Sequence, residues 1–194
     1  MHAVAAAQTR SDSGAAVWDV APYIGLAQHS PVGYDWGATA DRSHLFLGIH
    51  LRTPVVRVAQ VQVFYAPTIT PLLRLSHDRP AGSSEAKERT AYAIGFAPFG
   101  LAVGFPISAT VRAYGSTAVG ALWFNRVVPI TDARAFNVSL EWGGSLEWSR
   151  TPSTAIELGY RFHHLSNVYS AIENPGVDAN MFYIGHRWRR AVRR

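Results

Sequence analysis

The sequence predicts an all-β protein: an eight-stranded antiparallel transmembrane β-barrel of the outer-membrane type. Three observations favour this fold. Of the 194 residues, 48% are hydrophobic and 16% charged, yet the mean hydropathy is only +0.01, far below that of a bundle of membrane helices. Apolar residues recur at every second position in eight segments, the period of a strand with one apolar face. The connections alternate between long and short, as in barrels with long external loops and tight periplasmic turns.

The eight segments make one domain. We expect residues 14–188 to form the barrel, residues 1–13 to be a flexible N-terminus or the remnant of a signal peptide, and residues 189–194 to be an arginine-rich periplasmic tail. Ala5 and Ala7 before Gln8 form an A-x-A cleavage pattern, and an ordinary flexible terminus is the alternative. The expected strands are Val17–Gln28, His44–Arg52, Val55–Ala66, Tyr92–Phe105, Ala109–Trp123, Ala135–Arg150, Thr154–Ser166 and Asp178–Trp188.

The fourth strand lies in a stretch, Tyr92 to Val111, that carries no charge and has the length of a membrane helix. Glycine and proline would weaken a helix there. The apolar alternation instead runs to Phe96, slips at Pro98 and resumes at Phe99. The pattern therefore predicts one long strand with a β-bulge. The interrupting residues are Gly95, Pro98, Gly100, Gly104 and Pro106.

The segment Ala135–Arg150 shows the clearest alternation, with apolar Phe136, Val138, Leu140 and Trp142 separated by polar or small residues. It is longer than the ~5–6 residues usual for a globular strand, which argues against a soluble β-sandwich. A sandwich or a lipocalin-like barrel is the alternative fold. Closure into a barrel removes the sheet edges, which hydrocarbon does not tolerate.

Three polar residues fall on the lipid-facing side of the last two strands. An even number of strands places both termini in the periplasm, so the loop Asn167–Val177 lies outside, at the level of the outer leaflet. Even-numbered residues of the seventh strand are apolar up to Phe162, and His164 and Ser166 follow on the same face. On the eighth strand Asp178 has the same parity as the apolar residues Phe182, Ile184 and Trp188.

These residue types suit nucleophilic acyl transfer. Ser166 would be the nucleophile, His164 the general base, and Asp178 the carboxylate that holds the imidazole in the required tautomer. The alternative is that all three are ordinary polar residues at the level of the lipid headgroups. His163 points into the barrel, and Glu173 lies in the middle of the loop on the other parity, so both are inferior candidates.

The stretch from Gly159 to Asn167, GYRFHHLSN, followed by NPGVD ending at Asp178, resembles the signature of the lipid A 3-O-deacylase (PagL) family. The resemblance implies an eight-stranded outer-membrane barrel in which His164 is the base, Ser166 the nucleophile and Asp178 the acid. It also implies that Asn167 contributes to the oxyanion hole. The substrate implied is lipid A, the membrane anchor of lipopolysaccharide, and no cofactor or metal is required.

The chain departs from the family pattern at two places. Well-known members have Glu where this chain has Asp178, so we expect the shorter side chain to need a backbone shift or to contact His164 less well. They have Ala-Gly after the Ser-Asn pair, where this chain has Val168 and Tyr169. These departures favour the alternative function, a non-enzymatic structural or lipid-organising barrel. Hydrolysis of phospholipid or another acyl ester is a second enzymatic alternative.

The charge distribution gives little support to nucleic acid binding. The formal net charge is +5, but much of the excess comes from arginines at the C-terminus. We expect that tail to be solvated or to meet periplasmic polyanions. Three loop arginines could contact lipid A phosphates, the alternative being solvated loop charge. They are Arg42, Arg74 and Arg79.

Overall fold

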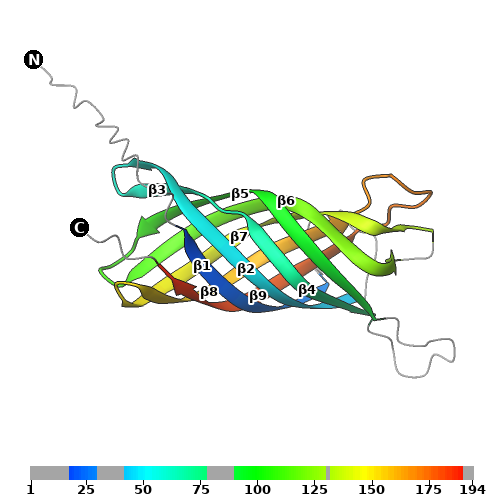
Figure 1. Ribbon diagram of the computed structural model, residues 1–194, viewed down its shortest axis with the longest axis horizontal. Helices are drawn as coiled ribbons and strands as arrows, with labels where there is room; N and C mark the ends of the chain where they lie inside the picture. The colour runs from blue at the N-terminus through cyan, green and yellow to red at the C-terminus, as the bar shows by residue number, and fades with distance from the viewer. Residues whose placement is uncertain (1–17, 30–41, 78–89, 130–131, 190–194) are drawn as a thin grey trace, which may run out of the picture.

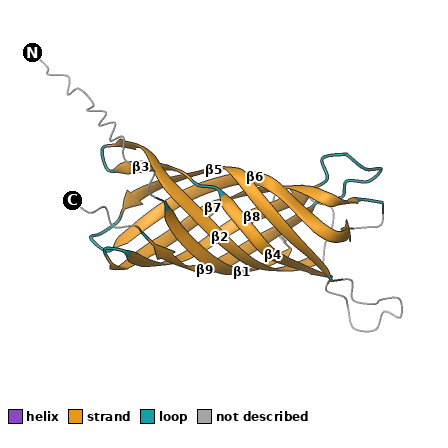
Figure 2. Cartoon of the chain, viewed as in Figure 1, coloured by secondary structure: helices purple, strands orange, loops and turns teal. Residues whose placement is uncertain are grey.

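The structure is a computed structural model that describes residues 18–29, 42–77, 90–129 and 132–189. One antiparallel sheet contains all of its strands (Figures 1 and 2). No helix in this part of the chain is long and apolar enough to cross a membrane. The strands are β1 (Asp19–His29), β2 (Arg42–Val58), β3 (Val61–Tyr65), β4 (Thr68–His77), β5 (Ala91–Pro106), β6 (Val111–Val128), β7 (Arg134–Thr151), β8 (Thr154–Ser166) and β9 (Val177–Trp188).

The sheet closes on itself because β1 pairs with both β2 and β9. The strands β3 and β4 each pair with β2 on one side and β5 on the other, so they are two halves of one barrel strand. The closed ring therefore has eight strands, as the sequence predicts. The residues 1–13 and 190–194, which include the expected N-terminal segment and most of the expected tail, lie outside the described residues, as does Arg79.

The boundaries predicted for the second and third strands are wrong. The turn predicted after Arg52 does not occur: β2 continues to Val58, and the turn falls at Ala59. Thr68–His77, expected to be loop, is strand β4. The cause lies in two prolines, which cannot donate to a ladder and are tolerated at bulges. Pro54 and Pro71 each lie at a shift of register, between Pro54 and Val56 and between Thr70 and Leu73.

The fourth expected strand is confirmed together with its bulge. The register of β5 against β6 shifts between Phe96 and Phe99. Before the shift the even-numbered Tyr92 and Ile94 are exposed, and after it the odd-numbered Leu101 is exposed. One outward face is thus kept along the whole strand.

The two ends of the barrel differ. The strand β1 begins and β9 ends at the same end, where Val20 pairs with Trp188, and we call this the terminal end. The short turns after β2, β5 and β7 lie there. The opposite end, which we call the loop end, carries the longer connections (Figure 1). This arrangement confirms the predicted alternation of long and short connections.

Charged side chains fill the lumen near the terminal end. Glu157 is fully buried and accepts hydrogen bonds from Arg52 (2.6 Å), Ser145 (2.9 Å), Tyr183 (3.0 Å) and Arg187. Glu147 pairs with Arg52 (3.2 Å) and with Arg189. Arg187, within β9, and Arg189, the first residue of the expected tail, thus both bind carboxylates inside the barrel.

Toward the loop end the lumen becomes more apolar. Arg161 Nη1 donates to Glu141 Oε2 at 2.7 Å, and His163 is fully buried beside this pair, which confirms that it points inward. Above them lies a buried hydrophobic cluster. The lumen is thus occupied by side chains along its length, and a bulky ligand has no room there. Members of the cluster include Phe46, Leu73, Leu75, Leu165, Val177 and Met181.

Candidate active site

The register of β8 against β9 places His164 directly opposite Asp178. The Cβ atoms of two directly opposed residues lie only ~4.5–5.5 Å apart. Asp178 Oδ1 lies 2.6 Å from His164 Nδ1. The Asp178 side chain is fully buried, whereas that of His164 is 15% exposed. A buried carboxylate is thus in hydrogen-bond contact with an imidazole that reaches the outer surface of the barrel wall.

The shorter acidic side chain is within hydrogen-bond distance of the imidazole. The sequence predicts that Asp178, in place of the family's Glu, needs a backbone shift or contacts His164 less well, and the 2.6 Å distance contradicts the second of these expectations. The two residues are opposed in an unbroken stretch of the β8–β9 ladder, so one methylene suffices to span the gap. Asp178 is held by the regular sheet rather than by a loop.

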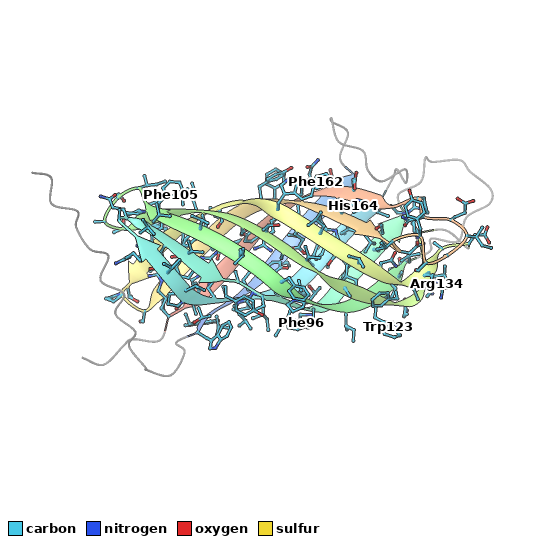
Figure 3. The ribbon with its side chains drawn as sticks, turned by 90° about the horizontal axis from the view of Figure 1, so that it is seen from above. Phe96, Phe105, Trp123, Arg134, Phe162 and His164 are labelled. Atoms are coloured by element: carbon cyan, nitrogen blue, oxygen red, sulfur yellow. The ribbon has the colours of Figure 1, made fainter. Side chains whose placement is uncertain are left out.

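Ser166 is the last residue of β8 and lies two positions beyond His164 on the same face. It is half-buried and pairs with Val138 of β7. The even-numbered residues of β8 below it, such as Leu158 and Tyr160, are exposed on the barrel exterior, which confirms the predicted parity. Figure 3 shows His164 and Phe162 together on the outer surface of the wall. The structure therefore places His164, Ser166 and Asp178 at the loop end, on the outside.

Asn167 is buried and ties together the connection between β8 and β9. Its backbone N–H donates to Asn174 Oδ1 at 2.9 Å, and its Nδ2 donates to the Glu173 carbonyl oxygen at 2.7 Å. Its Oδ1 has no hydrogen-bond partner among the described residues. Asn167 thus fixes the loop directly beside Ser166. Glu173 itself is exposed and takes part through its backbone.

A tight turn follows Asn167. The Ser170 N–H donates to the Asn167 carbonyl oxygen at 3.0 Å, and the two residues between them, Val168 and Tyr169, have φ angles of 54° and 56°. This is the geometry of a type I′ turn, which favours Asn and Gly. A β-branched residue with positive φ is a strained backbone position. The departure from the family sequence therefore coincides with strain next to Ser166.

Four further residues surround the site on the lipid-facing surface. Phe162 packs against Trp142, with ring centroids 4.4 Å apart. Tyr160 Oη donates to Asn180 Oδ1 at 2.5 Å. Their outward parity is visible in the sequence, but these contacts are not, because both depend on the register between neighbouring strands. An amide on a surface that faces hydrocarbon is costly, which marks Asn180 as a residue with a specific role.

Taken together, the side chains supply a hydroxyl, an imidazole and a buried carboxylate, the groups that acyl transfer through a covalent intermediate uses. Among the residues that the structure describes, no group of three His, Asp or Glu side chains is placed to hold a metal ion.

Of the arginines expected in loops, Arg42 is buried at the start of β2 and Arg74 lies within β4, so neither is a loop residue. Arg42 Nη2 contacts the Pro129 carbonyl oxygen at 3.4 Å.

Comparison with known proteins gives one family and several similar structures. The model of the lipid A 3-O-deacylase (PagL) family matches residues 59–187. The crystal structure of the outer membrane enzyme PagL is 12% identical, with a TM-score of 0.58, and the match covers 86% of this chain and 97% of that chain. Neisserial surface protein A is 13% identical, with a TM-score of 0.49 and coverage of 90% and 96%. Ail of Yersinia pestis is 12% identical, with a TM-score of 0.48 and coverage of 90% and 97%.

No curated protein matches the chain in sequence. At these identities the likeness to the PagL crystal structure concerns the fold, an outer-membrane β-barrel. The family match carries more, because it extends over most of the barrel and includes β8 and nearly all of β9, which hold His164, Ser166 and Asp178. It shows that this chain belongs to the lipid A 3-O-deacylase (PagL) family.

Proposed function

We propose that the protein is a bacterial outer-membrane serine esterase that removes the 3-O-linked acyl chain of lipid A. The observation that carries this proposal is the 2.6 Å contact between Asp178 Oδ1 and His164 Nδ1, with Ser166 two residues further along the same face. The carboxylate fixes the imidazole so that Nε2 is the basic nitrogen. In the proposed reaction that nitrogen accepts the proton of the serine hydroxyl.

The reaction has two steps. His164 Nε2 takes the proton of Ser166 Oγ as that oxygen attacks the carbonyl carbon of the ester. The tetrahedral intermediate collapses, the ester C–O bond breaks, and the sugar hydroxyl leaves with the proton from His164. Water, deprotonated by His164, then attacks the acyl-serine and releases the 3-hydroxy fatty acid, while the proton returns to Ser166. Asp178 stabilises the imidazolium in both steps.

Asn167 is the proposed oxyanion donor. The side-chain amide carries two hydrogens, and the contact with the Glu173 carbonyl uses one of them. The other is available to the oxygen of the tetrahedral intermediate. A donor in such a position contributes ~2.7–4 kcal/mol to transition-state stabilisation. The bonds from Asn167 to Glu173 and Asn174 hold the group in place before the substrate arrives.

The position of the site on the exterior of the wall suits a lipid substrate. A multiply acylated glycolipid cannot enter an eight-stranded barrel whose lumen is full of side chains. It can, however, diffuse laterally onto the wall. We assign the loop end to the outside of the cell and the terminal end to the periplasm, which brings the site to the outer leaflet, where lipid A resides. The partner is then lipopolysaccharide within the membrane, and nucleic acid is not one.

Mass spectrometry of lipopolysaccharide incubated with the purified, folded protein tests the proposal. We expect the loss of one hydroxyacyl mass with the wild type and none with Ser166→Ala. Ser170→Ala is the matched control, because Ser170 is exposed in the same loop and its contacts are made by its backbone. Activity that persists in Ser166→Ala would refute the assignment of the nucleophile.

Two other outcomes correspond to the alternative functions. If the folded wild type removes no acyl chain, a non-enzymatic structural or lipid-organising barrel becomes the better explanation. If fatty acid is released from phospholipid vesicles but not from lipopolysaccharide, the substrate assignment is wrong although the protein is an esterase. Migration on unheated gels establishes that each variant is folded.

A further inference from the structure

A hollow of about 520 Å³ opens on the outer surface at the loop end, beside the candidate active site. It lies between the connection that precedes β7 and the loop that follows β8. Its walls include Arg134, Asp132 and Ile172, and its floor includes the aromatic rings of Trp123 and Phe136. Figure 3 shows Arg134 close to the loop end, with Trp123 nearby.

Arg134 is anchored but retains most of its donors. Its Nε donates to the Ser170 carbonyl oxygen at 2.5 Å, which orients the guanidinium toward the β8–β9 loop. The terminal Nη1 and Nη2 groups have no hydrogen-bond or ion-pair partner within the described residues. Asp132 lines the same hollow without pairing with Arg134. An oriented guanidinium with four unused N–H groups is a ready partner for a phosphate, which it can contact through two parallel hydrogen bonds.

The position of Arg134 relative to Ser166 is defined by the sheet. Arg134 shares the outward face of β7 with Val138, and Val138 pairs with Ser166. Four residues of strand separate Arg134 from Val138 by about 13 Å, toward the loop end. A lipid whose ester lies at Ser166 therefore has its more polar, headgroup portion at the level of Arg134.

The surface below the hollow is apolar. A groove of about 900 Å³ crosses the outside of β4, β5, β6 and β7, and it shares Trp123 and Phe136 with the hollow. Exposed apolar side chains such as Phe96, Phe99 and Val119 line it, and it runs past the bulge of β5. A hollow that presents an oriented guanidinium and is continuous with an apolar groove matches an amphipathic molecule that carries an anionic head and hydrocarbon chains.

We infer that Arg134 binds a phosphate group on the headgroup of the lipid substrate and thereby selects phosphorylated over unphosphorylated lipid. The hollow would hold the phosphate, and the groove below would accept acyl chains of the same molecule that are not cleaved. This inference rests on the proposed function, since it names a specificity-determining residue for that reaction. Arg134 acts through substrate binding and takes no part in proton transfer.

The test measures binding separately from turnover. In the Ser166→Ala background, reconstituted in nanodiscs, the dissociation constants of bisphosphorylated lipid A and of enzymatically dephosphorylated lipid A are compared. Arg134→Gln should weaken binding of the phosphorylated lipid about tenfold to a hundredfold and leave the dephosphorylated lipid unchanged. Arg134→Lys keeps the charge and should recover part of the loss. Asp132→Asn should tighten binding of the phosphorylated lipid.

Arg126→Gln is the matched control, because Arg126 is an exposed arginine near the same end of β6 that does not line the hollow. It should bind both lipids as the parent does. Equal binding of the two lipids by the parent, or an Arg126→Gln effect as large as that of Arg134→Gln, would overturn the inference. Competition by millimolar inorganic phosphate would show that the site recognises the phosphate itself, and no competition would show that the attached lipid is needed.

The result is separable from the fate of the proposed function. Arg134-dependent binding by a wild-type protein that releases no acyl chain would refute the esterase and keep the phosphate site. Turnover by wild type and Arg134→Gln with equal KM on both lipids would keep the esterase and refute the site. A rise in KM with unchanged kcat in Arg134→Gln, confined to the phosphorylated lipid, supports both.

Discussion

Asp178 Oδ1 lies 2.6 Å from His164 Nδ1 because the two residues face each other across the β8–β9 ladder. The pair is therefore positioned by the same backbone hydrogen bonds that close the barrel. Asp178 needs no loop to bring it to the imidazole, and its full burial keeps water from competing for the carboxylate. The His164 side chain is 15% exposed, and Ser166 lies two residues further along the same face of β8.

Replacement of Asp178 by Asn should leave the barrel folded and lower kcat for acyl release by about 10²–10⁴-fold, because an amide does not enforce the required tautomer or stabilise the imidazolium. Asp178→Glu should retain more activity than Asp178→Asn, since it keeps the charge, although the extra methylene must be accommodated in a gap already closed at 2.6 Å. Acyl release under saturating lipopolysaccharide measures both. Equal activity of Asp178→Asn and the wild type would remove Asp178 from the mechanism.

Loss of the Glu157 charge should lower the free energy of unfolding of the barrel. It is fully buried and accepts hydrogen bonds from two arginines, a tyrosine and a serine. Glu157→Gln leaves Arg52 and Arg187 without their full counter-charge, and loss of one partner of a buried ion pair costs about 3–5 kcal/mol. Urea unfolding from lipid vesicles measures the change. Glu173→Gln, at an exposed loop position, should leave the free energy of unfolding unchanged.

Most of the fold could be predicted because each strand has one lipid-facing side, and this places apolar residues at every second position of the sequence. The β5 bulge illustrates this: the change of parity at Pro98 is visible in the sequence and corresponds to a shift of register. The prediction is wrong around Pro54 and Pro71, which fall outside the expected strands but lie at bulges inside β2 and β4. Proline excludes a ladder hydrogen bond, yet its sequence neighbours do not reveal whether a bulge makes that loss harmless.

The face of the barrel on which the site residues lie could be predicted from their odd or even positions, but their contacts could not. Parity placed His164, Ser166 and Asp178 on one face, but only the register shows that Asp178 is opposite His164. Register likewise determines that Tyr160 bonds to Asn180 and that Trp142 packs on Phe162. The arginines near the C-terminus are a related case. Charge density alone does not show that Arg187 and Arg189 have carboxylate partners inside the lumen.

The hydrogen bond between Tyr160 and Asn180 should contribute measurably to stability. Tyr160→Phe removes the hydroxyl that donates to Asn180 Oδ1 and leaves an amide oxygen facing hydrocarbon. Hydrogen bonds between side chains in membranes are worth about 0.6–2 kcal/mol, so we expect a destabilisation of that size in urea unfolding. Tyr92→Phe is the control, because Tyr92 is also exposed on the lipid-facing surface but no such bond of its hydroxyl occurs in the described part of the barrel. Equal effects would indicate that the hydroxyls act by partitioning to the membrane interface.

Gly143 should be intolerant of a side chain. A Cβ atom there would lie 2.0 Å from the Tyr160 carbonyl oxygen and 2.8 Å from Arg161 Cα, both in the backbone of β8. Gly143→Ala must therefore displace the strand that carries His164 and Ser166, at a cost of about 1–3 kcal/mol or more. Gly115→Ala on β6 meets nothing within 4 Å and should be neutral. Folding yield and urea unfolding distinguish the two, and a neutral Gly143→Ala would mean that β7 and β8 separate easily.

Replacement of the turn residues Val168 and Tyr169 should stabilise the loop. Both residues have positive φ, which costs an L-residue about 1–2 kcal/mol. Replacement by Asn-Gly should relieve that strain without changing the path of the backbone. Part of the gain is offset by the greater freedom of glycine in the unfolded chain, so we expect a net stabilisation of about 1 kcal/mol. Because Tyr169 is 84% exposed, little packing is lost.

The same turn positions Asn167, so its geometry should matter for activity. Asn-Gly at residues 168 and 169 should preserve the Ser170–Asn167 hydrogen bond and hence kcat. Tyr169→Pro cannot adopt positive φ and should open the turn, which would lower kcat while the barrel stays folded. If both variants released acyl chains at the wild-type rate, the turn would play no part in presenting Asn167. Loss of activity in the Asn-Gly variant despite higher stability would instead show that the side chains of Val168 and Tyr169 themselves contact the lipid.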